Sequence, residues 1–384
     1  MLPTLAVSFA VQLVLWLAAS VGLKRVAAAQ PPEGPAPPLP LSVVVAAHDE
    51  AETLPALLAA LAAQTHAPFE VVVVDDRSSD GTADVVRQLA ARQPGAAPER
   101  TTGATAVRVV RVGAEASAAS GLPPKKYAVT QGIAAARHER IVVTDADGRP
   151  PPTWLSTLAR HAAPDGKDTG AVLVGFGPYV AAAGWLNRFV RFETVQTAVW
   201  AAAAIGLGRP WQAVGRNLSY PKAVFEAVGG FRSSAGSLSG DDDLLLHEIV
   251  RQRAAAVHYV LDADASVASA APSGWGAFWR QKRRHASAGA HYPAWALGAL
   301  GAVHVTALAL WVGAPLLHAL TGSAAGWGLL AAKLLVQSAV LRLFRDALGT
   351  EGDLGLALPL LDAASAAYHA AFAALGLLPA PQRW

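Results

Sequence analysis

The stretches LSVVVAAHDE (41–50) and FEVVVVDDRSSDGT (69–82) decide the fold, because each joins an unbroken apolar run to polar residues. Continuous β-branched runs of this length are typical of strands buried on both faces of a parallel sheet. VRVVRV (107–112) and RIVVTDAD (140–147) supply two further strands. Leucines at helical spacing predict a helix over 51–64, between the first and second strands. A second helix is expected over 80–92, between the second and third strands, and Asp80 can cap it. The sequence therefore predicts a doubly wound α/β domain.

Acidic side chains follow three of these strands. His48-Asp49-Glu50 ends the first run, Asp75-Asp76 the second, and Asp145 and Asp147 the fourth. In open α/β sheets, ligands bind outside the carboxyl ends of the strands. The sequence contains neither a GxGxxG fingerprint nor a GxxxxGK[ST] phosphate loop, which argues against dehydrogenases and P-loop enzymes. We expect the three acidic clusters to meet at one edge of the sheet; three separate solvated strand ends are the alternative.

The composition points to a membrane protein. Hydrophobic residues make up 53% of the 384 residues and charged residues only 15%, against about 25% in ordinary soluble proteins. The net charge of +3 does not indicate a nucleic-acid partner. Cysteine is absent, which excludes disulfides, cysteine metal sites and thiol nucleophiles.

The apolar excess is concentrated near the two ends of the chain. Residues 2–23 carry no charge and are followed by Lys24-Arg25, which predicts a first span with its C-terminal end in the cytoplasm; a cleaved signal peptide is the alternative. Three further spans are expected near 294–319, 323–343 and 355–378, with Asp362 as a hydrated carboxylate at the membrane interface. The short apolar segment 198–208 fits either the membrane interface or a soluble core.

These patterns predict four regions. They are an N-terminal membrane anchor (1–25), a proline-rich linker (26–40), a soluble α/β domain (41–290) and a C-terminal membrane region (291–384). The expected location is the cell inner membrane, with several spans and the soluble domain in the cytoplasm.

The motif TDADG (144–148) places Asp145 and Asp147 at a strand end. Two carboxylates at this spacing can approach one divalent cation together with a diphosphate, and Mg²⁺ typically binds one or two carboxylates plus substrate phosphates. The motif alone is weak evidence, because Asp-x-Asp also occurs in turns and calcium loops.

Seven segments in order resemble the membrane-anchored family 2 glycosyltransferases, which have a GT-A fold and include cellulose synthase and poly-N-acetylglucosamine synthase catalytic subunits. The segments are VVVAAHDEAETLPALLAAL, VVVVDDRSSDGT, PPKKYAVTQGI, TDADG, GRNLSYPKAVFEAVGGF, SGDDDLLL and RQKRRH. The resemblance implies a GT-A nucleotide-diphospho-sugar transferase domain over 41–290, with one N-terminal and about three C-terminal transmembrane helices.

The resemblance assigns roles to residues at the donor site. His48, Glu50 and Asp76 would contact the nucleotide. Asp145 would contact the ribose or the metal, and Asp147 would bind the metal, Mg²⁺ or Mn²⁺. Lys125 would approach the nucleotide or diphosphate, although it can also be a solvated lysine beside Lys126.

It also assigns roles on the acceptor side. Asp241 would be the catalytic base, with Asp242 the second candidate; the alternative for the Asp241–Asp243 triplet is a capped helix start. Gly230, Phe231, Gln281 and Arg284 would contact the acceptor or the diphosphate. His285 replaces the tryptophan usual in the last motif, and the surrounding basic residues can instead meet anionic lipid headgroups.

The predicted function is inverting transfer of a sugar from a UDP- or GDP-sugar to a lipid or glycan acceptor at the membrane. A carboxylate would take the acceptor proton, and the metal would stabilise the departing nucleoside diphosphate. The partners would then be the nucleotide sugar, the acceptor and membrane lipids, without nucleic acid. A processive polysaccharide synthase is one alternative, and a non-catalytic membrane-tethered nucleotide-sugar binding protein is another.

Overall fold

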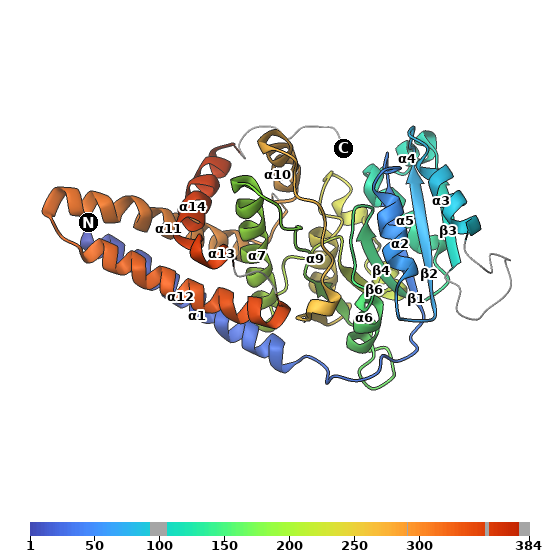
Figure 1. Ribbon diagram of the computed structural model, residues 1–384, viewed down its shortest axis with the longest axis horizontal. Helices are drawn as coiled ribbons and strands as arrows, with labels where there is room; N and C mark the ends of the chain where they lie inside the picture. The colour runs from blue at the N-terminus through green and yellow to red at the C-terminus, as the bar shows by residue number, and fades with distance from the viewer. Residues whose placement is uncertain (93–105, 290, 350–352, 376–384) are drawn as a thin grey trace. The chain divides into compact units, whose positions relative to one another are not determined.

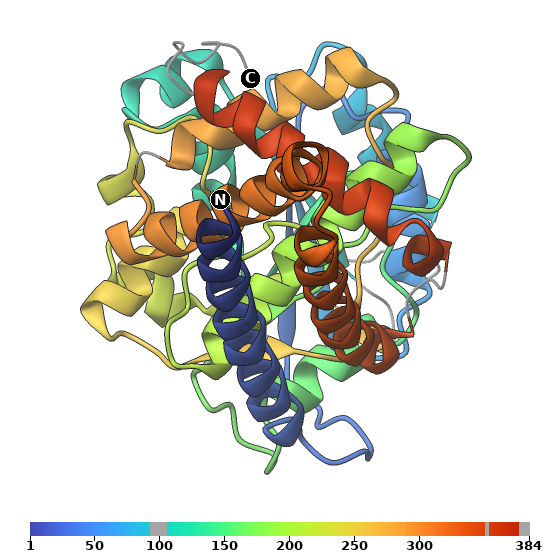
Figure 2. The ribbon, with the colours of Figure 1, turned by 90° about the vertical axis from the view of Figure 1, so that its left-hand side faces the viewer.

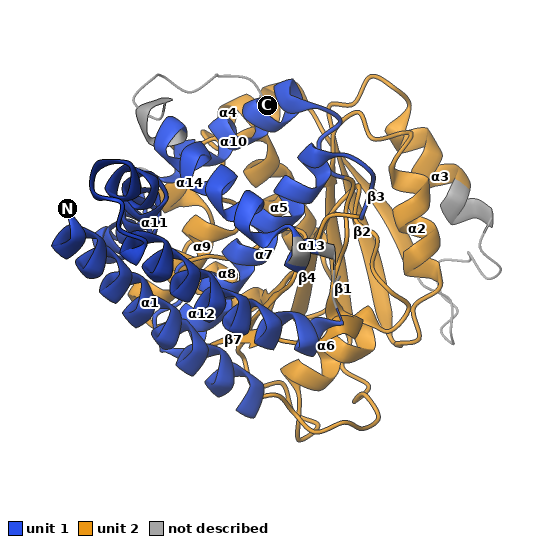
Figure 3. Ribbon diagram, turned by 60° about the vertical axis from the view of Figure 1, so that its left-hand side comes forward, with its two compact units in different colours: residues 1–28, 181–211, 271–381 blue, residues 29–180, 212–270, 382–384 orange. Residues whose placement is uncertain are grey.

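The structure is a computed structural model that describes residues 1–92, 106–289, 291–349 and 353–375. The chain forms two compact units (Figure 3). The helical unit comprises residues 1–28, 181–211 and 271–381, and the sheet unit comprises residues 29–180, 212–270 and 382–384. Residues 181–211 and 271–290 thus belong to the helical unit, and the division into four regions stays a prediction.

The sheet unit alternates strands and helices, as the apolar runs predict (Figure 1). Its strands are β1 (Leu41–Ala47), β2 (Phe69–Asp76), β3 (Ala106–Val112), β4 (Arg140–Asp145), β5 (Val172–Gly175), β6 (Leu218–Pro221) and β7 (Val257–Val260). Its helices are α2 (Leu54–Ala62), α3 (Thr82–Arg92), α4 (Ala114–Ala119), α5 (Pro124–Ala135), α6 (Trp154–Ala162), α8 (Lys222–Ala227) and α9 (Asp243–Gln252), with short 3₁₀ turns η1 (Arg232–Ser234) and η2 (Ala263–Ala265). The four predicted strands and two predicted helices of this unit are confirmed.

The seven strands form one mixed sheet in the order β3-β2-β1-β4-β6-β5-β7. Strands β3, β2, β1 and β4 are parallel, whereas β6 is antiparallel to both β4 and β5. The chain runs from β1 outward to β2 and β3, and then returns to place β4 on the other side of β1. The order of the strands therefore reverses between β1 and β4, and their carboxyl ends form the crevice where doubly wound sheets bind ligands.

Both faces of the sheet are buried at β1, β2 and β4, which explains why these strands read as continuous apolar runs. Val43 and Val45 pack with α2 and α6 in one core, whereas Val72 and Val74 belong to a second core that includes Ala128 of α5. In α5, a Cβ added to Gly132 would lie 2.4 Å from Val44 Cγ1. Helix α5 therefore lies close against the sheet, and this packing fixes the lysine pair at its first turn.

The helical unit contains α1 (Leu2–Ala28), α7 (Trp185–Gly206), α10 (Trp275–Gly289), α11 (Ala294–Thr321), α12 (Ala325–Leu348), α13 (Asp353–Leu356) and α14 (Leu358–Leu375). Within the described residues, α1, α11 and α12 are long and apolar enough to cross a membrane. The structure therefore has one N-terminal and two C-terminal candidate spans, where we expected about three at the C-terminus. Helix α14, which is 18 residues long and carries Asp362, is not among these candidate spans. Residues 376–378 of the expected third span lie outside the described residues.

Helix α1 contacts α7, α11 and α12 (Figure 2). A Cβ on Gly206 of α7 would lie 2.0 Å from the carbonyl oxygen of Gly22 of α1, so glycine lets these two backbones touch. Gln12 of α1 donates from Nε2 to the carbonyl oxygen of Val303 (2.6 Å) and to Thr306 Oγ1 (2.8 Å) of α11. Of the segment 198–208, residues 198–206 are part of the long helix α7 in the helical unit, and residues 207 and 208 form the turn that follows it.

Asp362 is not the hydrated carboxylate that the sequence suggested. Its side chain is 5% exposed and pairs with the Lys333 ammonium, whose Nζ lies 2.6 Å from both carboxylate oxygens. Trp311 Nε1 donates to Asp362 Oδ2 (2.7 Å), and Lys333 also donates to Gln337 Oε1 (2.6 Å). The prediction was wrong because the partner cation lies on another helix, 29 positions earlier in the chain.

Candidate functional site

The carboxyl ends of β1 and β4 bring acidic residues together in the sheet unit. Glu50 follows β1, and Asp145 and Asp147 end and follow β4. Burial raises the pKa of Glu50, and the charges of Asp147 and Asp145 raise it further, whereas the hydrogen bond from Thr53 opposes the rise. The acidic residues that follow the first and fourth strands therefore converge, as predicted.

The turn after β4 places Asp145 and Asp147 beside each other. Gly148 N donates to the Asp145 carbonyl oxygen (3.0 Å), and a Cβ at Gly148 would lie 2.8 Å from Thr144 Oγ1, so the tight turn requires glycine. Burial raises the pKa of Asp147, and the like charge of Asp145 adds to this rise. The two carboxylates of Asp145 and Asp147 repel each other. A hard divalent cation, which prefers oxygen ligands, would relieve this repulsion. Within the described residues, no group of three or more His, Asp or Glu side chains could hold a metal by itself.

Lys125, in the first turn of α5, connects the two sides of the site. Its Nζ lies 3.0 Å from Asp145 Oδ1 and 2.8 Å from Asp241 Oδ2, and its side chain is 18% exposed. Burial alone would lower the pKa of Lys125, but the charges of Asp145 and Asp241 raise it above its ordinary value. Lys125 is therefore a charged bridge between the end of β4 and the start of α9, which excludes the solvated alternative.

The three aspartates before and within α9 have different surroundings. Each carboxylate oxygen of Asp242 accepts a backbone N–H, from Asp243 (2.7 Å) and from Gly215 (2.9 Å). Asp243 Oδ1 accepts the N–H of Ala213 (2.7 Å). The second and third aspartates thus cap α9 and hold the segment before β6, whereas Asp241 points its carboxylate at Lys125.

The crowding of these charges changes one pKa strongly. Burial raises the pKa of Asp242 to about 6, and the neighbouring charge of Asp241 contributes to the rise while Lys125 opposes it. The predicted effect of three adjacent carboxylates is therefore present at the middle one.

Lys126 is a member of the site that the sequence did not single out. Its side chain is 1% exposed, and its Nζ donates to the carbonyl oxygens of Ser234 (2.8 Å) and Ser237 (2.9 Å) and to Ser234 Oγ (3.1 Å). Burial lowers its pKa to about 8, against the opposing charges of Asp241 and Asp242. Lys126 thus fixes the loop that leads to Asp241. The Lys-Lys pair was visible in the sequence, but its separate partners were not.

Arg216 is a second residue that the sequence analysis missed. Its guanidinium donates to Ser269 Oγ (2.9 Å) and to the Gly177 carbonyl oxygen (2.5 Å), and lies 4.7 Å from the centroid of the Tyr179 ring. Its charge lowers the pKa of Asp147, in opposition to burial. Arg216 lies within the quoted segment GRNLSYP, so a basic residue beside a family motif was the available signal.

His48 and Asp76 are also brought together, though not through the Asp76 carboxylate. His48 Nδ1 lies 2.6 Å from the Asp76 carbonyl oxygen. The Asp76 carboxylate is fully buried and accepts two hydrogen bonds from Arg77, at 2.7 and 3.0 Å. Asp76 therefore shapes the turn after β2 and presents its backbone to His48.

Gly230 and Phe231 form a turn after α8. Gly230 has a φ of +60°, and a Cβ there would lie 2.8 Å from Phe225 Cζ. Phe231 is 2% exposed and packs edge-on against Phe225 at 5.2 Å between centroids. These contacts show packing and turn formation; contact with the acceptor or diphosphate stays a prediction.

Two family models match the sequence. One, described as Glycosyl transferase family 2, matches residues 42–105. The other, described as Glycosyl transferase family group 2, matches residues 140–350, which is more than half of the chain.

The chain belongs to the family 2 glycosyltransferases. Within its described residues it has helices long and apolar enough for membrane association.

Individual relatives agree with this assignment. The Probable glycosyltransferase YdaM of Bacillus subtilis is 27% identical over 253 residues, covering 64% of this chain and 54% of that protein. The Undecaprenyl-phosphate 4-deoxy-4-formamido-L-arabinose transferase of Serratia proteamaculans is 47% identical over 58 residues, covering 14% of this chain and 18% of that protein. The chain thus spans about half the length of the first of these relatives and less of the second.

A solved structure confirms the GT-A fold. The mannosyltransferase PcManGT from Pyrobaculum calidifontis, in complex with GDP-Man and Mn²⁺, aligns with a TM-score of 0.51 and 19% identity. The alignment covers 95% of this chain and 99% of that chain.

In this family 2 glycosyltransferase, the remaining predicted site residues lie in the helical unit. Gln281 and Arg284 are on α10, three positions apart and hence on one face of the helix. Their contact with the acceptor or diphosphate stays a prediction, as does a role for His285.

Proposed function

We propose that this protein is an inverting glycosyltransferase that moves a sugar from a nucleoside-diphosphate donor to a lipid-linked or membrane-associated acceptor. The observation that carries the proposal is the Lys125 bridge, which joins the Asp145–Asp147 pair at the end of β4 to Asp241 at the start of α9. A donor-side acidic pair and an acceptor-side carboxylate are the two parts that a direct displacement needs.

Asp145 and Asp147 would hold a divalent cation, Mg²⁺ or Mn²⁺. The cation would supply positive charge to the diphosphate leaving group. The raised pKa of Asp147 supports this assignment, because a second positive charge at the pair would stabilise its ionised form. Lys125 already offers one ammonium to Asp145, and it would orient the diphosphate on the same side.

Asp241 would act as the general base that takes the proton of the attacking acceptor oxygen, either an alcohol hydroxyl or the P–OH group of a lipid phosphate. The contacts of its neighbours support this choice, since Asp242 and Asp243 are engaged with backbone N–H groups of Asp243, Gly215 and Ala213. Lys125 Nζ lies 2.8 Å from Asp241 Oδ2, and Lys126 holds the preceding loop in place. Removing a positioned general base typically costs 10²- to 10⁴-fold in rate.

The donor site would use His48, Glu50 and Asp76 at the ends of β1 and β2, and the donor would be a UDP- or GDP-sugar. The structurally similar mannosyltransferase is described in complex with GDP-Man and Mn²⁺, which makes GDP-mannose one donor to test. The transferase from Serratia proteamaculans is named for undecaprenyl phosphate, which supports testing a lipid phosphate as acceptor.

The proposed location is the cell inner membrane with the catalytic domain in the cytoplasm. Lys24 and Arg25 at the end of α1, and Arg342 and Arg345 near the end of α12, support this orientation.

The experiment is a donor and acceptor panel on the full-length protein in lipid nanodiscs. Labelled UDP- and GDP-sugars are offered with lipid phosphates and Mg²⁺ or Mn²⁺, and lipid products are separated from polymer. We expect one donor to label lipid, with loss of labelling after EDTA treatment and in Asp147→Asn. Asp84→Asn is the matched control, because the Asp84 side chain is 64% exposed on α3. Label only in long polymer would contradict the proposed acceptor class, and unchanged transfer in Asp147→Asn would contradict the metal assignment.

A further inference from the structure

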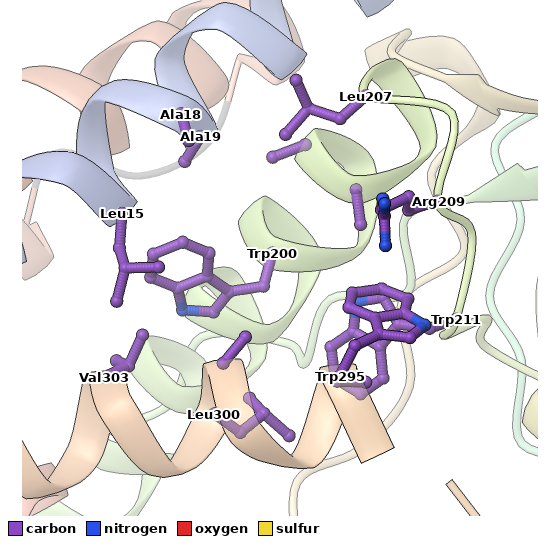
Figure 4. Close-up of a pocket in the computed structure, with 14 residues that line it drawn as sticks. Leu15, Ala18, Ala19, Trp200, Leu207, Arg209, Trp211, Trp295, Leu300 and Val303 are labelled. Carbon is purple, nitrogen blue, oxygen red and sulfur yellow. The ribbon is translucent and has the colours of Figure 1, made fainter. Parts of the chain in front are cut away.

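The helical unit contains an apolar cavity walled by α1, α7, α11 and the segment after α7 (Figure 4). Its volume is about 130 Å³, and its lining is almost wholly apolar. The larger side chains in the lining are Leu15, Trp200, Trp211, Trp295 and Leu300, and Arg209 is the charged residue among them. Apolar cavities of about 150 Å³ stay dry and accept benzene-sized molecules. This cavity therefore suits a segment of a hydrocarbon chain.

The cavity exists because small side chains face each other where α1 and α7 meet. Ala18 and Ala19 of α1 line it opposite Ala203 and Ala204 of α7. The backbones are held together next to this region by the contact between Gly22 and Gly206 described above. The glycines bring the two backbones together, and the alanines beside them have side chains too short to fill the space between the helices. Larger residues at the alanine positions would fill the cavity.

Two of the three tryptophans of the wall are fixed by neighbours outside it. Trp200 packs against Trp16, with ring centroids 4.6 Å apart, and Trp211 packs edge-on against Tyr292 at 5.6 Å. Rigid aromatic walls favour binding, because little side-chain entropy is lost when a ligand enters. The cavity is thus preformed.

The helices around the cavity are those suited to the membrane. α1 and α11 are candidate spans, and exposed apolar side chains such as Val14 and Leu17 of α1 and Leu297 of α11 would face lipid. Hydrocarbon chains are therefore the molecules present at high concentration around this part of the protein.

Arg209 adds a charge at the edge of the cavity. Its guanidinium carbon lies 5.8 Å from the centroid of the Trp295 ring, and its backbone N–H donates to the Ala204 carbonyl oxygen (2.8 Å) in the turn that ends α7. A guanidinium matches the oxygen geometry of a phosphate, and arginine and tryptophan are suited to the membrane–water interface. The cavity and Arg209 together match an amphiphile that has a phosphate next to a hydrocarbon chain.

We propose that this cavity binds the first part of the hydrocarbon chain of a lipid phosphate, with the phosphate against Arg209. The identification of this lipid as the acceptor rests on the proposed function above; the binding site itself does not. Since the phosphate is the group that would receive the sugar, the site would select the acceptor by its chain and its charge together.

The test measures binding to the full-length protein in detergent micelles. The probes are a polyisoprenyl phosphate and the corresponding polyisoprenyl alcohol, followed by native mass spectrometry and by tryptophan fluorescence. Ala204→Trp fills the cavity and is expected to weaken binding of both probes at least tenfold. Arg209→Gln is expected to weaken binding of the phosphate about tenfold and to leave the alcohol unchanged, because only a charge-assisted contact is lost.

Matched controls separate the site from general effects. Arg25→Gln removes another exposed arginine of the same unit, and Leu335→Phe adds bulk at a side chain that is 72% exposed on α12. Both are expected to bind like the parent. If Ala204→Trp does not fold, Trp295→Ala is the second variant: Trp295 lines the cavity and is 38% exposed, and its truncation removes part of the wall and is expected to weaken binding of both probes.

Each outcome decides a separate question. Parent-like binding by Ala204→Trp or Trp295→Ala would overturn the cavity as the binding site, and equal loss in Arg25→Gln and Arg209→Gln would overturn the phosphate contact. Weakened binding with unchanged sugar transfer to the same lipid would overturn its identification as the acceptor. Specific binding without transfer from any donor would leave the site standing and contradict the proposed function instead.

Discussion

The buried pair of Lys333 and Asp362 gives a sharp prediction about stability. The two side chains are 1% and 5% exposed, and the ammonium lies 2.6 Å from both carboxylate oxygens. Lys333→Met would leave the Asp362 carboxylate buried without its cation. Breaking a buried pair in this way costs about 3–5 kcal/mol, whereas replacing both partners with apolar residues is often neutral or stabilising.

The assay is thermal unfolding of the full-length protein in micelles, followed by tryptophan fluorescence. For units of this size, 1 kcal/mol corresponds to about 2–4 °C, so we expect Lys333→Met to lower Tm by about 10 °C. The double variant Lys333→Met, Asp362→Leu should recover most of this loss, in a double-mutant cycle. A matched control is Leu335→Met, on the exposed side of α12. The reasoning would be refuted by a Lys333→Met variant within 2 °C of the parent, or by a double variant as unstable as the single one.

Three further predictions follow from the two units. Transfer activity should fall as pH decreases through about 6, because protonation of Asp242, whose pKa burial raises to about 6, removes the charge that binds Gly215 N–H. In Asp242→Asn, which lacks this charge at every pH, activity should be low throughout and this limb should be absent; a parent profile flat down to pH 5 would contradict the assignment. Lys126→Met should lower kcat at least tenfold with little change in donor KM, because the loop before Asp241 loses three hydrogen bonds. Steady-state kinetics measure this effect, with Lys167→Met as the surface control. Equal kinetics for the two variants would disprove it. Gly206→Ala should destabilise the helical unit by roughly 2–3 kcal/mol, since overpacking against backbone cannot relax. Gly298→Ala is the control, because its Cβ would have no atom within 4 Å and should not destabilise the unit. Equal Tm values for the two variants would be inconsistent with the contact between Gly206 and Gly22.

The long strands β1, β2 and β4 were predictable because their burial on both faces leaves a strong pattern, and the edge strand β3 is apolar enough to show the same signal although it is only partly buried. The runs at β1, β2, β3 and β4 contain six to eight residues, whereas β5, β6 and β7 contain four each and were not predicted. Short strands in the middle of mixed sequence carry no periodic signal that separates them from turns. The meeting of the acidic residues at one edge of the sheet could also be predicted, since parallel strands place their carboxyl ends at the same edge.

The contacts within the site were less predictable, because they join distant parts of the chain. Lys126 reaches Ser234 and Ser237 across 108 and 111 positions, and Arg216 reaches Ser269 across 53. Both residues belong to motifs that the sequence analysis quoted. Only the packing of α5 against the sheet, however, directs Lys125 to Asp145 and Asp241 and directs Lys126 to the loop of Ser234 and Ser237. Asp362 was misplaced for the same reason, because Lys333 is on a different helix.

The differences among the three aspartates before α9 show what the structure adds to the family motif. The sequence offered Asp241 and Asp242 as candidate bases without a physical means of choosing. Hydrogen bonds to Gly215 N and Asp243 N occupy Asp242, and Asp241 faces Lys125. The proposed assignment of the base therefore depends on contacts outside the motif.

The most direct test of this account is a single-turnover measurement of sugar transfer with donor and divalent cation already bound. The account predicts that Asp241→Asn lowers the transfer rate by about 10²- to 10⁴-fold, with donor affinity within a few fold of the parent, while Asp84→Asn behaves like the parent. A transfer rate in Asp241→Asn close to that of the parent would contradict the role of Asp241 as the base and, with it, the proposed division of the site.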